Sequence, residues 1–276
     1  MRRRVRAVRA TEAHRHTLRA APGDLNYAYG PKGSDLANLR VSSLDAASVS
    51  VEFDGFTAEA QAAFQAAVDL WAATITTPVP IRIRANWTPL ASGVLGTAGP
   101  TTLCSRWEND EFTFYSAALA DKLSGSQSCA ALGSETAEID AEFNSTFPDW
   151  EFGTSGTGVP GKYNFMTVAL HEIGHGLGFF GLFQSSGGTG ALWGDPSIYD
   201  RFSVSGSGDP LLGLESPSTA LHDQLTGNNT FFNGAAATAR NAGSSPKLDT
   251  HYFDDGDFGW SEGSSYSHVD DQLYTG

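Results

Sequence analysis

An apolar stretch near the middle of the chain places the strongest constraint on the fold. Its sequence, KYNFMTVALHEIGHGLGFFG, is rich in helix-forming residues and contains the polar residues His171, Glu172 and His175. Residues four positions apart lie on the same face of a helix, so the two imidazoles point the same way. Three polar groups within an apolar helix would cost free energy if they had no partners. The stretch therefore predicts a helix near 163–180 whose polar groups share a ligand.

The residue types and the spacing of this HEIGH motif fit a catalytic zinc site. Neutral imidazoles suit zinc, and catalytic sites use three protein ligands. Glu172 projects about 100 degrees around the helix from His171, near enough to take a proton from an attacking water. In a chain with seven histidines, such a motif arises by chance with odds on the order of one in a hundred. We therefore predict that His171 and His175 bind Zn²⁺ and that Glu172 is a general base.

A third protein ligand is required, and several residues could supply it. In the compact pattern HExxHxxGxxH the last position is Gly181, so that version of the motif is absent. His268 lies in SSYSHVDD, where Asp270 and Asp271 could accept from its other ring nitrogen. The other two histidines outside the N-terminal 20 residues and the motif are His222 and His251. Asp195 and Glu215 are carboxylate alternatives, because they follow the motif at distances that other HExxH families use.

The segment HEIGHGLGF, followed by a long insertion and then by a separate SHVDD segment, resembles the leishmanolysin-like branch of the metzincin peptidases. In that branch the third histidine comes after an insertion. The resemblance covers the motif helix well, the preceding strands and helix loosely, and the insertion hardly at all. It implies that His171, His175 and His268 are the metal ligands, that Glu172 is the base and that Gly178 forms the turn ending the helix.

One departure from the metzincin pattern concerns methionine. Metzincins have a Met-containing turn beneath the metal, shortly after the third histidine. The methionines of this chain are Met1 and Met166. Either the chain stops before that turn, or Tyr274 in LYTG takes its place. Tyr266 or Tyr274 could also donate to a developing oxyanion, although packing is the simpler role for either.

The pattern of apolar residues predicts an α/β (α+β) fold, with a zincin-like twisted mixed sheet. Alternation indicates strands at 48–53, 81–87, 111–116 and 136–144. Helical spacing indicates a backing helix at 58–75. The last of these strands carries carboxylates on one face, which suggests a solvent-facing or edge strand along which a substrate could pair. The half after 187 is irregular, with one short helix suggested at SPSTALHDQLTG.

The charge is unevenly distributed along the chain. The formal net charge is −14, yet seven of the 17 basic residues fall in the first 20 positions. An acidic body excludes a nucleic-acid-binding face. We interpret residues 1–47 as a partly disordered tail and 48–276 as the peptidase domain, with subdomains 48–181 and 182–276.

Other features bear on the compartment and on further ions. No apolar run is long enough to span a membrane. Cys104 and Cys129 are compatible with one disulfide or with two buried thiols. Together with the composition, this favours a secreted protein whose signal peptide is not visible. The sequence DDGDFG at 254–259 could hold a structural Ca²⁺ but lacks the full EF-hand spacing.

The function predicted from these observations is a zinc-dependent endopeptidase acting on proteins or peptides, with Glu172 as general base. One alternative is a cell-surface binding module in which zinc has a structural role and catalysis is absent. Another is a zinc hydrolase that acts on a bond other than a peptide bond. The sequence does not indicate an oligomeric state.

Overall fold

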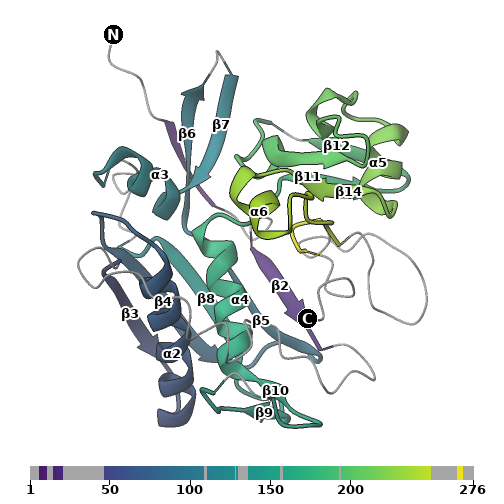
Figure 1. Cartoon of the computed structure of the whole chain (residues 1–276). Coiled ribbons are helices and arrows are strands. Elements are labelled where there is room, and N and C mark those ends of the chain that lie inside the picture. The colour runs from purple at the N-terminus through teal and green to yellow at the C-terminus, as the bar shows by residue number, and fades with distance from the viewer. Residues whose placement is uncertain are drawn as a thin grey trace. The chain divides into compact units, whose positions relative to one another are not determined.

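The computed structural model describes most of the chain between residues 47 and 249, together with a few short segments. The described residues are 6–10, 15–20, 47–108, 111–127, 129, 136–155, 158–192, 194–249 and 266–269. The chain divides into two compact units, whose elements are labelled in Figure 1. The first unit comprises residues 1–104 and 115–178, and the second comprises residues 105–114 and 179–276.

A five-stranded mixed sheet forms the centre of the first unit (Figure 1). Its strands, in spatial order, are β2 (His16–Arg19), β5 (Val94–Pro100), β8 (Ile139–Asn144), β4 (Ile81–Thr88) and β3 (Val49–Asp54). Strands β3, β4 and β8 run parallel, whereas β5 is antiparallel to β8 and β2 is antiparallel to β5. The predicted α/β class and the predicted mixed sheet are confirmed.

Alternation of apolar and polar residues explains which face of β4 is buried. Ile81, Ile83 and Ala85 are at most 4% exposed, whereas Arg82 and Arg84 between them lie on the other face and are partly exposed. Successive side chains of a strand point to opposite faces, so each apolar residue reaches the same core.

The prediction that 136–144 is a solvent-facing or edge strand is wrong. Strand β8 lies between β4 and β5, and its Ile139 and Phe143 are fully buried. The carboxylates on its other face are paired, because Arg84 Nε donates to Asp140 Oδ1 at 2.8 Å. One polar face is common to an edge strand and to an interior strand whose charges are paired, so alternation alone does not separate the two.

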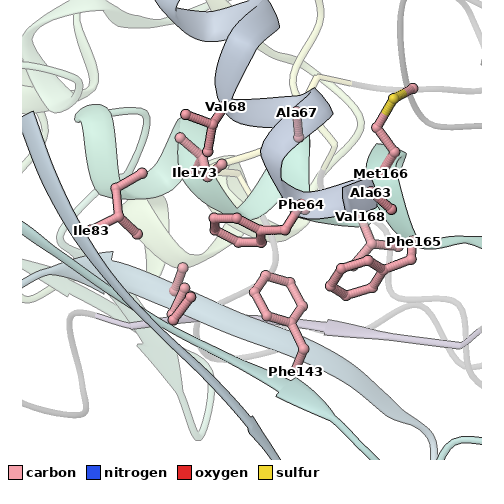
Figure 2. Close-up of a cluster of buried hydrophobic side chains, with 14 of the residues drawn as sticks. Ala63, Phe64, Ala67, Val68, Ile83, Phe143, Phe165, Met166, Val168 and Ile173 are labelled. Carbon is pink, nitrogen blue, oxygen red and sulfur yellow. The ribbon is translucent and has the colours of Figure 1, made fainter. Parts of the chain in front are cut away.

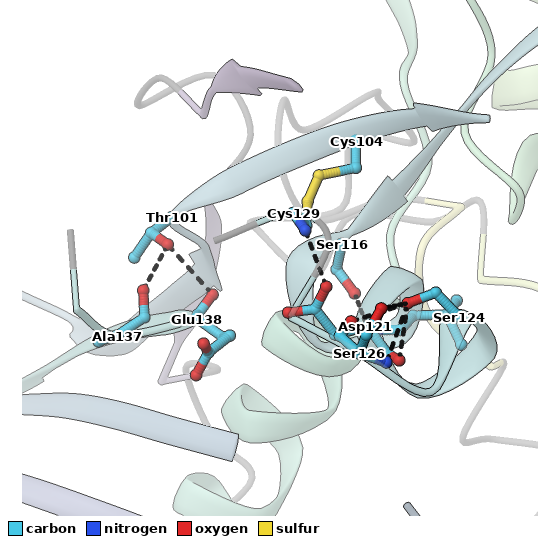
Figure 3. Close-up of a disulfide and its surroundings, with 10 residues drawn as sticks. Thr101, Cys104, Ser116, Asp121, Ser124, Ser126, Cys129, Ala137 and Glu138 are labelled. Carbon is cyan, nitrogen blue, oxygen red and sulfur yellow. Dashed lines mark hydrogen bonds between the residues drawn. A yellow bond between two sulfur atoms is a disulfide. The ribbon is translucent and has the colours of Figure 1, made fainter. Parts of the chain in front are cut away.

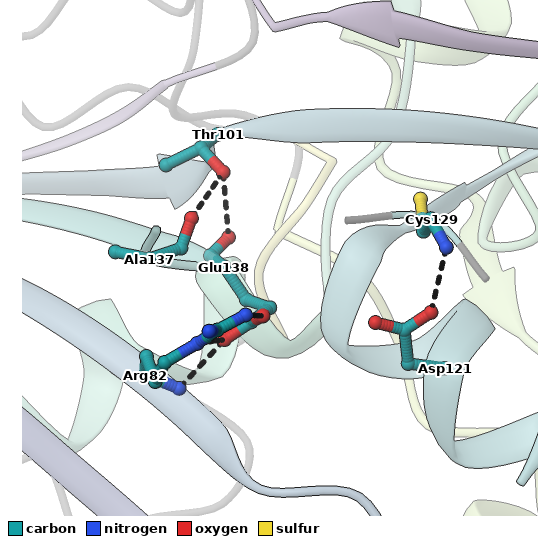
Figure 4. A network of polar contacts seen from close by, with 6 residues as sticks. All are labelled: Arg82, Thr101, Asp121, Cys129, Ala137 and Glu138. Atoms are coloured by element: carbon teal, nitrogen blue, oxygen red, sulfur yellow. Dashed lines mark hydrogen bonds and ion pairs between the residues drawn. The ribbon is translucent and has the colours of Figure 1, made fainter. Parts of the chain in front are cut away.

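An ion pair between the partly exposed Arg82 and the buried Glu138 holds the residue before β8 against β4 (Figure 4). Glu138 accepts hydrogen bonds from the backbone N–H of Arg82 at 2.7 Å and from its guanidinium at 2.5 and 3.3 Å. The hydrogen bond to Glu138 raises the pKa of Arg82. Thr101 donates to the backbone oxygen of Ala137 at 2.6 Å, so hydrogen bonds on both sides hold this corner of the sheet.

Helices α2 (Ala58–Thr74) and α4 (Phe165–Leu177) pack against the sheet and bury its apolar face. Figure 2 shows aromatic rings from α2, β8 and α4 meeting in this core. The ring centroid of Phe143 lies 5.6 Å from that of Phe64 and 5.0 Å from that of Phe165, both in edge-to-face contact. Such contacts add about 0.5–1.5 kcal/mol each beyond area burial.

Local capping explains where both helices begin. Thr57 and Asn164 each accept, through the side chain, a backbone N–H three residues on. This capping satisfies donors that a helix start leaves unpaired. Trp71 on α2 donates its indole N–H to the backbone oxygen of Leu170 on α4 at 2.9 Å. The helices predicted at 58–75 and near 163–180 are present, and the second is shorter at both ends.

Glycine lowers helix propensity, yet two glycines lie inside α4 and differ in their surroundings. A Cβ at Gly176 would overlap the side chain of Ile139 in β8, whereas the nearest atom to a Cβ at Gly174 is Trp71 Cζ2 at 3.4 Å. We expect Gly176→Ala to lower the free energy of unfolding by about 1–3 kcal/mol. The matched change Gly174→Ala should raise it by up to about 1 kcal/mol. Urea unfolding measures both, and equal effects would contradict the close approach of α4 to β8.

A disulfide joins Cys104 to Cys129, which confirms the bonded alternative for the two cysteines (Figure 3). Both residues are at most 1% exposed. The backbone N–H of Cys129 donates to Asp121 Oδ1 at 2.9 Å, and Asp121 lies on α3 (Ala117–Ser124). The disulfide therefore ties the strand β6 to the residues that follow α3.

The remaining elements are short. A three-stranded sheet has the order β1 (Arg6–Arg9), β6 (Thr102–Glu108), β7 (Glu111–Ser116). Two-residue strands β9 (Trp150–Glu151) and β10 (Tyr163–Asn164) pair in parallel. The second unit contains β11 (Phe183–Ser186), β12 (Thr189–Leu192), η2 (Asp200–Phe202), β13 (Ser203–Ser205), η3 (Leu211–Gly213), α5 (Thr219–Thr226), β14 (Thr230–Phe232) and α6 (Ala235–Arg240).

The second unit has a small core of its own. It is formed by Phe183, Tyr199, Leu211, Leu221, Leu225, Leu248 and Tyr266. The short helix suggested by SPSTALHDQLTG is present as α5. No helix among the described residues is long and apolar enough to cross a membrane.

Candidate metal centre

Helix α4 brings His171 and His175 together, as the spacing of four predicts. The two Nε2 atoms lie 3.0 Å apart. Ligand atoms about 2.0–2.1 Å from a tetrahedral zinc ion lie about 3.3 Å from one another. The two rings therefore present their nitrogens at a separation that one ion can bridge. The helix ends directly afterwards, because Gly178 adopts a φ of 128°, a region that disfavours residues with a side chain.

Among the described residues, one group of histidine, cysteine or carboxylate side chains can hold a metal ion. It comprises His171, His175 and His268, whose ligand atoms all lie within 4.8 Å of one another. Three imidazoles form a donor set that zinc accepts in catalytic sites. The group thus contains the two motif histidines and the one that the family resemblance implies.

Glu172, which follows His171 in the chain, is fully buried. Neither of its carboxylate oxygens has a hydrogen-bond partner of normal geometry in the described part of the chain. Burial raises the pKa of Glu172 well above its ordinary value, and the peptide groups of Ala98 and Leu18 lower it in part. A buried carboxyl without a firm partner costs stability, so its position calls for a functional reason.

The segment carrying His268 is held by hydrogen bonds within the second unit. Ser267 Oγ accepts from the backbone N–H of Gly181 at 2.9 Å, and the backbone oxygen of His268 accepts from Asp249 N at 2.8 Å. A Cβ at Gly181 would overlap the ring of Tyr266. Position 181 is where the compact motif would have its third histidine. Here the space for a side chain at this position is occupied by Tyr266, whose segment also carries His268.

Asp200 anchors the same segment, and the sequence did not single it out. Its fully buried carboxylate accepts from Tyr266 Oη at 2.5 Å, from Ser197 N at 2.7 Å and from Leu182 N at 3.1 Å. Burial raises the pKa of Asp200, and these hydrogen bonds lower it. Both aspartates of the segment WGDPSIYD are candidates by residue type. Asp195 is the one predicted as a possible ligand, whereas Asp200 makes these hydrogen bonds.

Tyr266 is occupied by this network. Its hydroxyl donates to Asp200 and accepts from the backbone N–H of Phe183 at 2.7 Å. Burial raises the pKa of Tyr266 well above its ordinary value, as it does for Tyr199. The hydroxyl therefore remains a neutral donor at physiological pH and serves the packing role rather than that of an oxyanion donor.

The other residues considered as third ligands fall into two sets. His222 lies on α5, and its Nδ1 is 2.6 Å from Ser185 Oγ. Neither it nor Asp195 nor Glu215 belongs to a metal-ligand group among the residues the structure describes. Beyond the described residues lie His251, Asp270, Asp271, Tyr274 and the possible calcium loop at 254–259.

Met166 is 3% exposed and belongs to the first-unit core, so it is a packing residue of α4.

No protein-family model, curated protein or solved structure matches the chain. The fold and the site together define an α/β protein with a histidine group able to hold a metal ion. The metzincin resemblance rests on the sequence motif.

Proposed function

We propose that the chain is a zinc-dependent endopeptidase of the metzincin type, acting on protein or peptide substrates. One observation carries the proposal: the ligand atoms of His171, His175 and His268 lie within 4.8 Å of one another. Glu172, the neighbour of His171 in the chain, is fully buried. Three imidazoles favour zinc over magnesium or calcium, which take oxygen ligands. When bound, zinc supplies a Lewis acid that polarises a carbonyl group and lowers the pKa of water.

Glu172 performs the proton transfer in this proposal. Its carboxylate accepts a proton from the attacking water and then delivers it to the amine that leaves. Glu172 must hold the proton between the two steps, as a carboxyl group can; in the metal-free protein burial raises its pKa. The apolar surroundings that raise the pKa also strengthen the electrostatic interactions of the site.

The disulfide between Cys104 and Cys129 supports a place for the protein outside the cytosol. Disulfides persist in oxidising compartments and are rare in reducing ones. We therefore propose that the protein is secreted.

Chelation and restoration of the metal test the proposed function. We expect the zinc-loaded protein to cleave casein or a fluorogenic peptide, to lose this activity with a chelator and to regain it with one equivalent of Zn²⁺. Magnesium added in the same way is the control and should restore nothing. Cleavage that persists after complete metal removal, or a zinc-loaded protein that cleaves no peptide bond, would overturn the proposal.

The third ligand has a matched test of its own. Changes to residues that only orient a ligand cost about 10–100-fold in metal affinity. We therefore expect His268→Ala to weaken zinc binding more than about 100-fold, measured by competition with a chromophoric chelator. His222→Ala, which removes a histidine outside the group, should leave the affinity unchanged. The opposite ranking would assign the third ligand elsewhere.

A further inference from the structure

The N-terminal segment forms the outermost strand of the main sheet, next to the candidate catalytic carboxyl group. Strand β2 pairs antiparallel with β5, with Thr17 opposite Thr97 and Leu18 opposite Gly96. The ladder continues beyond the strand, because Ala20 N donates to the backbone oxygen of Gly93 at 2.7 Å. Residues 15–20 thus use the backbone edge of β5 that an added peptide strand would use.

Leu18 connects this strand to the site. Its side chain packs against the first-unit core, and its peptide group lies beside the Glu172 carboxyl group. Glu172 is 0% exposed in this arrangement. A general base needs contact with the reacting groups, so the strand occupies space that a substrate would need.

Arg15 anchors the segment on the other face of the sheet. Its guanidinium forms an ion pair with Asp140, and a second with Glu142 at 3.3 Å, both on β8. The Arg15 and Asp140 side chains are only 14% and 13% exposed. The N-terminal 20 residues hold seven of the 17 basic residues, and the rest of the chain is strongly acidic. The charge of the segment therefore complements the surface on which it lies.

We propose that residues 15–20 are an internal ligand that occupies the substrate-binding edge of β5. A substrate must displace this segment and bind in its place. We therefore expect an extended peptide with a basic residue three positions before an aliphatic one, the spacing of Arg15 and Leu18 in the segment. This inference rests on the proposed peptidase function. A tethered segment competes at an effective concentration in the millimolar range, set by its linker. It raises the apparent KM and leaves kcat unchanged, because a displaced ligand no longer affects the chemical step.

Two full-length variants loosen the segment by independent contacts. Arg15→Glu reverses its ion pairs, and Leu18→Asp removes its apolar contact. For a peptide with arginine three positions before leucine, we expect each variant to lower the apparent KM by about tenfold or more at unchanged kcat and zinc content. Arg240→Glu and Leu123→Asp, which make the same changes at exposed positions, are the matched controls. An unchanged or higher KM in both variants, with thermal unfolding as in the parent, would overturn the proposal.

The substrate class is tested on the same proteins. Exchange of arginine for glutamate, or of leucine for aspartate, in the peptide should lower kcat/KM about tenfold or more in both variants. Equal turnover of all three peptides would overturn the preference.

A binding experiment separates this inference from the peptidase proposal. If zinc-loaded parent and variants cleave no peptide, the proposed function fails, and the internal ligand is judged by binding alone. A fluorescent peptide with the sequence of residues 13–21 should then bind Leu18→Asp at least about tenfold more tightly than the parent, as measured by anisotropy. Equal affinities would overturn the internal-ligand proposal.

Discussion

Glu172→Gln is expected to keep its zinc and to lose about 10²–10⁴-fold in kcat for peptide cleavage. Glutamine has nearly the same shape but cannot accept the proton of the attacking water. Because Glu172 is not among the three residues that group as metal ligands, zinc affinity should change little. Steady-state kinetics on a fluorogenic peptide and metal analysis of the same preparation measure the two quantities.

The control for this variant is Glu215→Gln, which makes the same change at an exposed carboxylate. It should cleave as the parent does. A Glu172→Gln protein as active as the parent would remove Glu172 from the mechanism, whereas loss of zinc from it would make Glu172 a ligand.

In the metal-free protein, the stability of Glu172→Gln should depend on pH differently from that of the parent. Because burial raises the pKa of Glu172 in the folded state, the folded protein binds this proton more tightly than the unfolded chain does. Stability from this group is then lost as the pH rises above about 4.3, the ordinary value for glutamate. Glutamine does not titrate, so the stability of Glu172→Gln relative to the parent should grow from pH 4 upward, as followed by thermal unfolding.

Asp200→Asn is expected to destabilise the second unit by about 3 kcal/mol. The carboxylate accepts hydrogen bonds from Tyr266, Ser197 and Leu182, and an asparagine amide group would place a donor against one of these donors. The loss is large because the site is fully buried and water cannot replace the missing acceptor. Guanidinium unfolding measures the change.

Asp223→Asn at an exposed position of α5 is the matched control and should change stability by less than about 0.5 kcal/mol. The network also holds the segment that carries His268, so Asp200→Asn should weaken zinc binding as well. A variant with parental stability and parental zinc affinity would contradict the anchoring role of Asp200.

The motif helix and the three parallel strands of the main sheet could be predicted because their signals are local. In β4, alternation of Ile81 and Ile83 with arginines places each residue on a face, and in α4 a spacing of four aligns His171 with His175. Capping by Thr57 and Asn164 involves residues three apart, so these contacts are equally visible in the sequence. The close approach of the two imidazoles is therefore a property of one helical turn.

Strand order, by contrast, is a long-range property. The acidic face of 136–144 is typical of an exposed edge strand unless the partners of its carboxylates are known. These partners, Arg84 in β4 and Arg15 just before β2, are far away in the sequence. The sequence of the N-terminal segment is interpreted as a tail because its basic residues lack interleaved aromatic residues and precede a loop-like stretch. Pairing with β5 supplies the backbone partners, and Asp140 and Glu142 on β8 supply the opposite charges.

The two motif histidines, the acid beside them and the class of the fold follow from the order of residues alone, since short-range geometry dictates them. The grouping of a distant histidine with the motif, the burial of Asp200 and the strand lying beside Glu172 depend on contacts between segments separated by tens of residues or more. No periodicity encodes such contacts, because they are selected by the free energy of packing the whole chain.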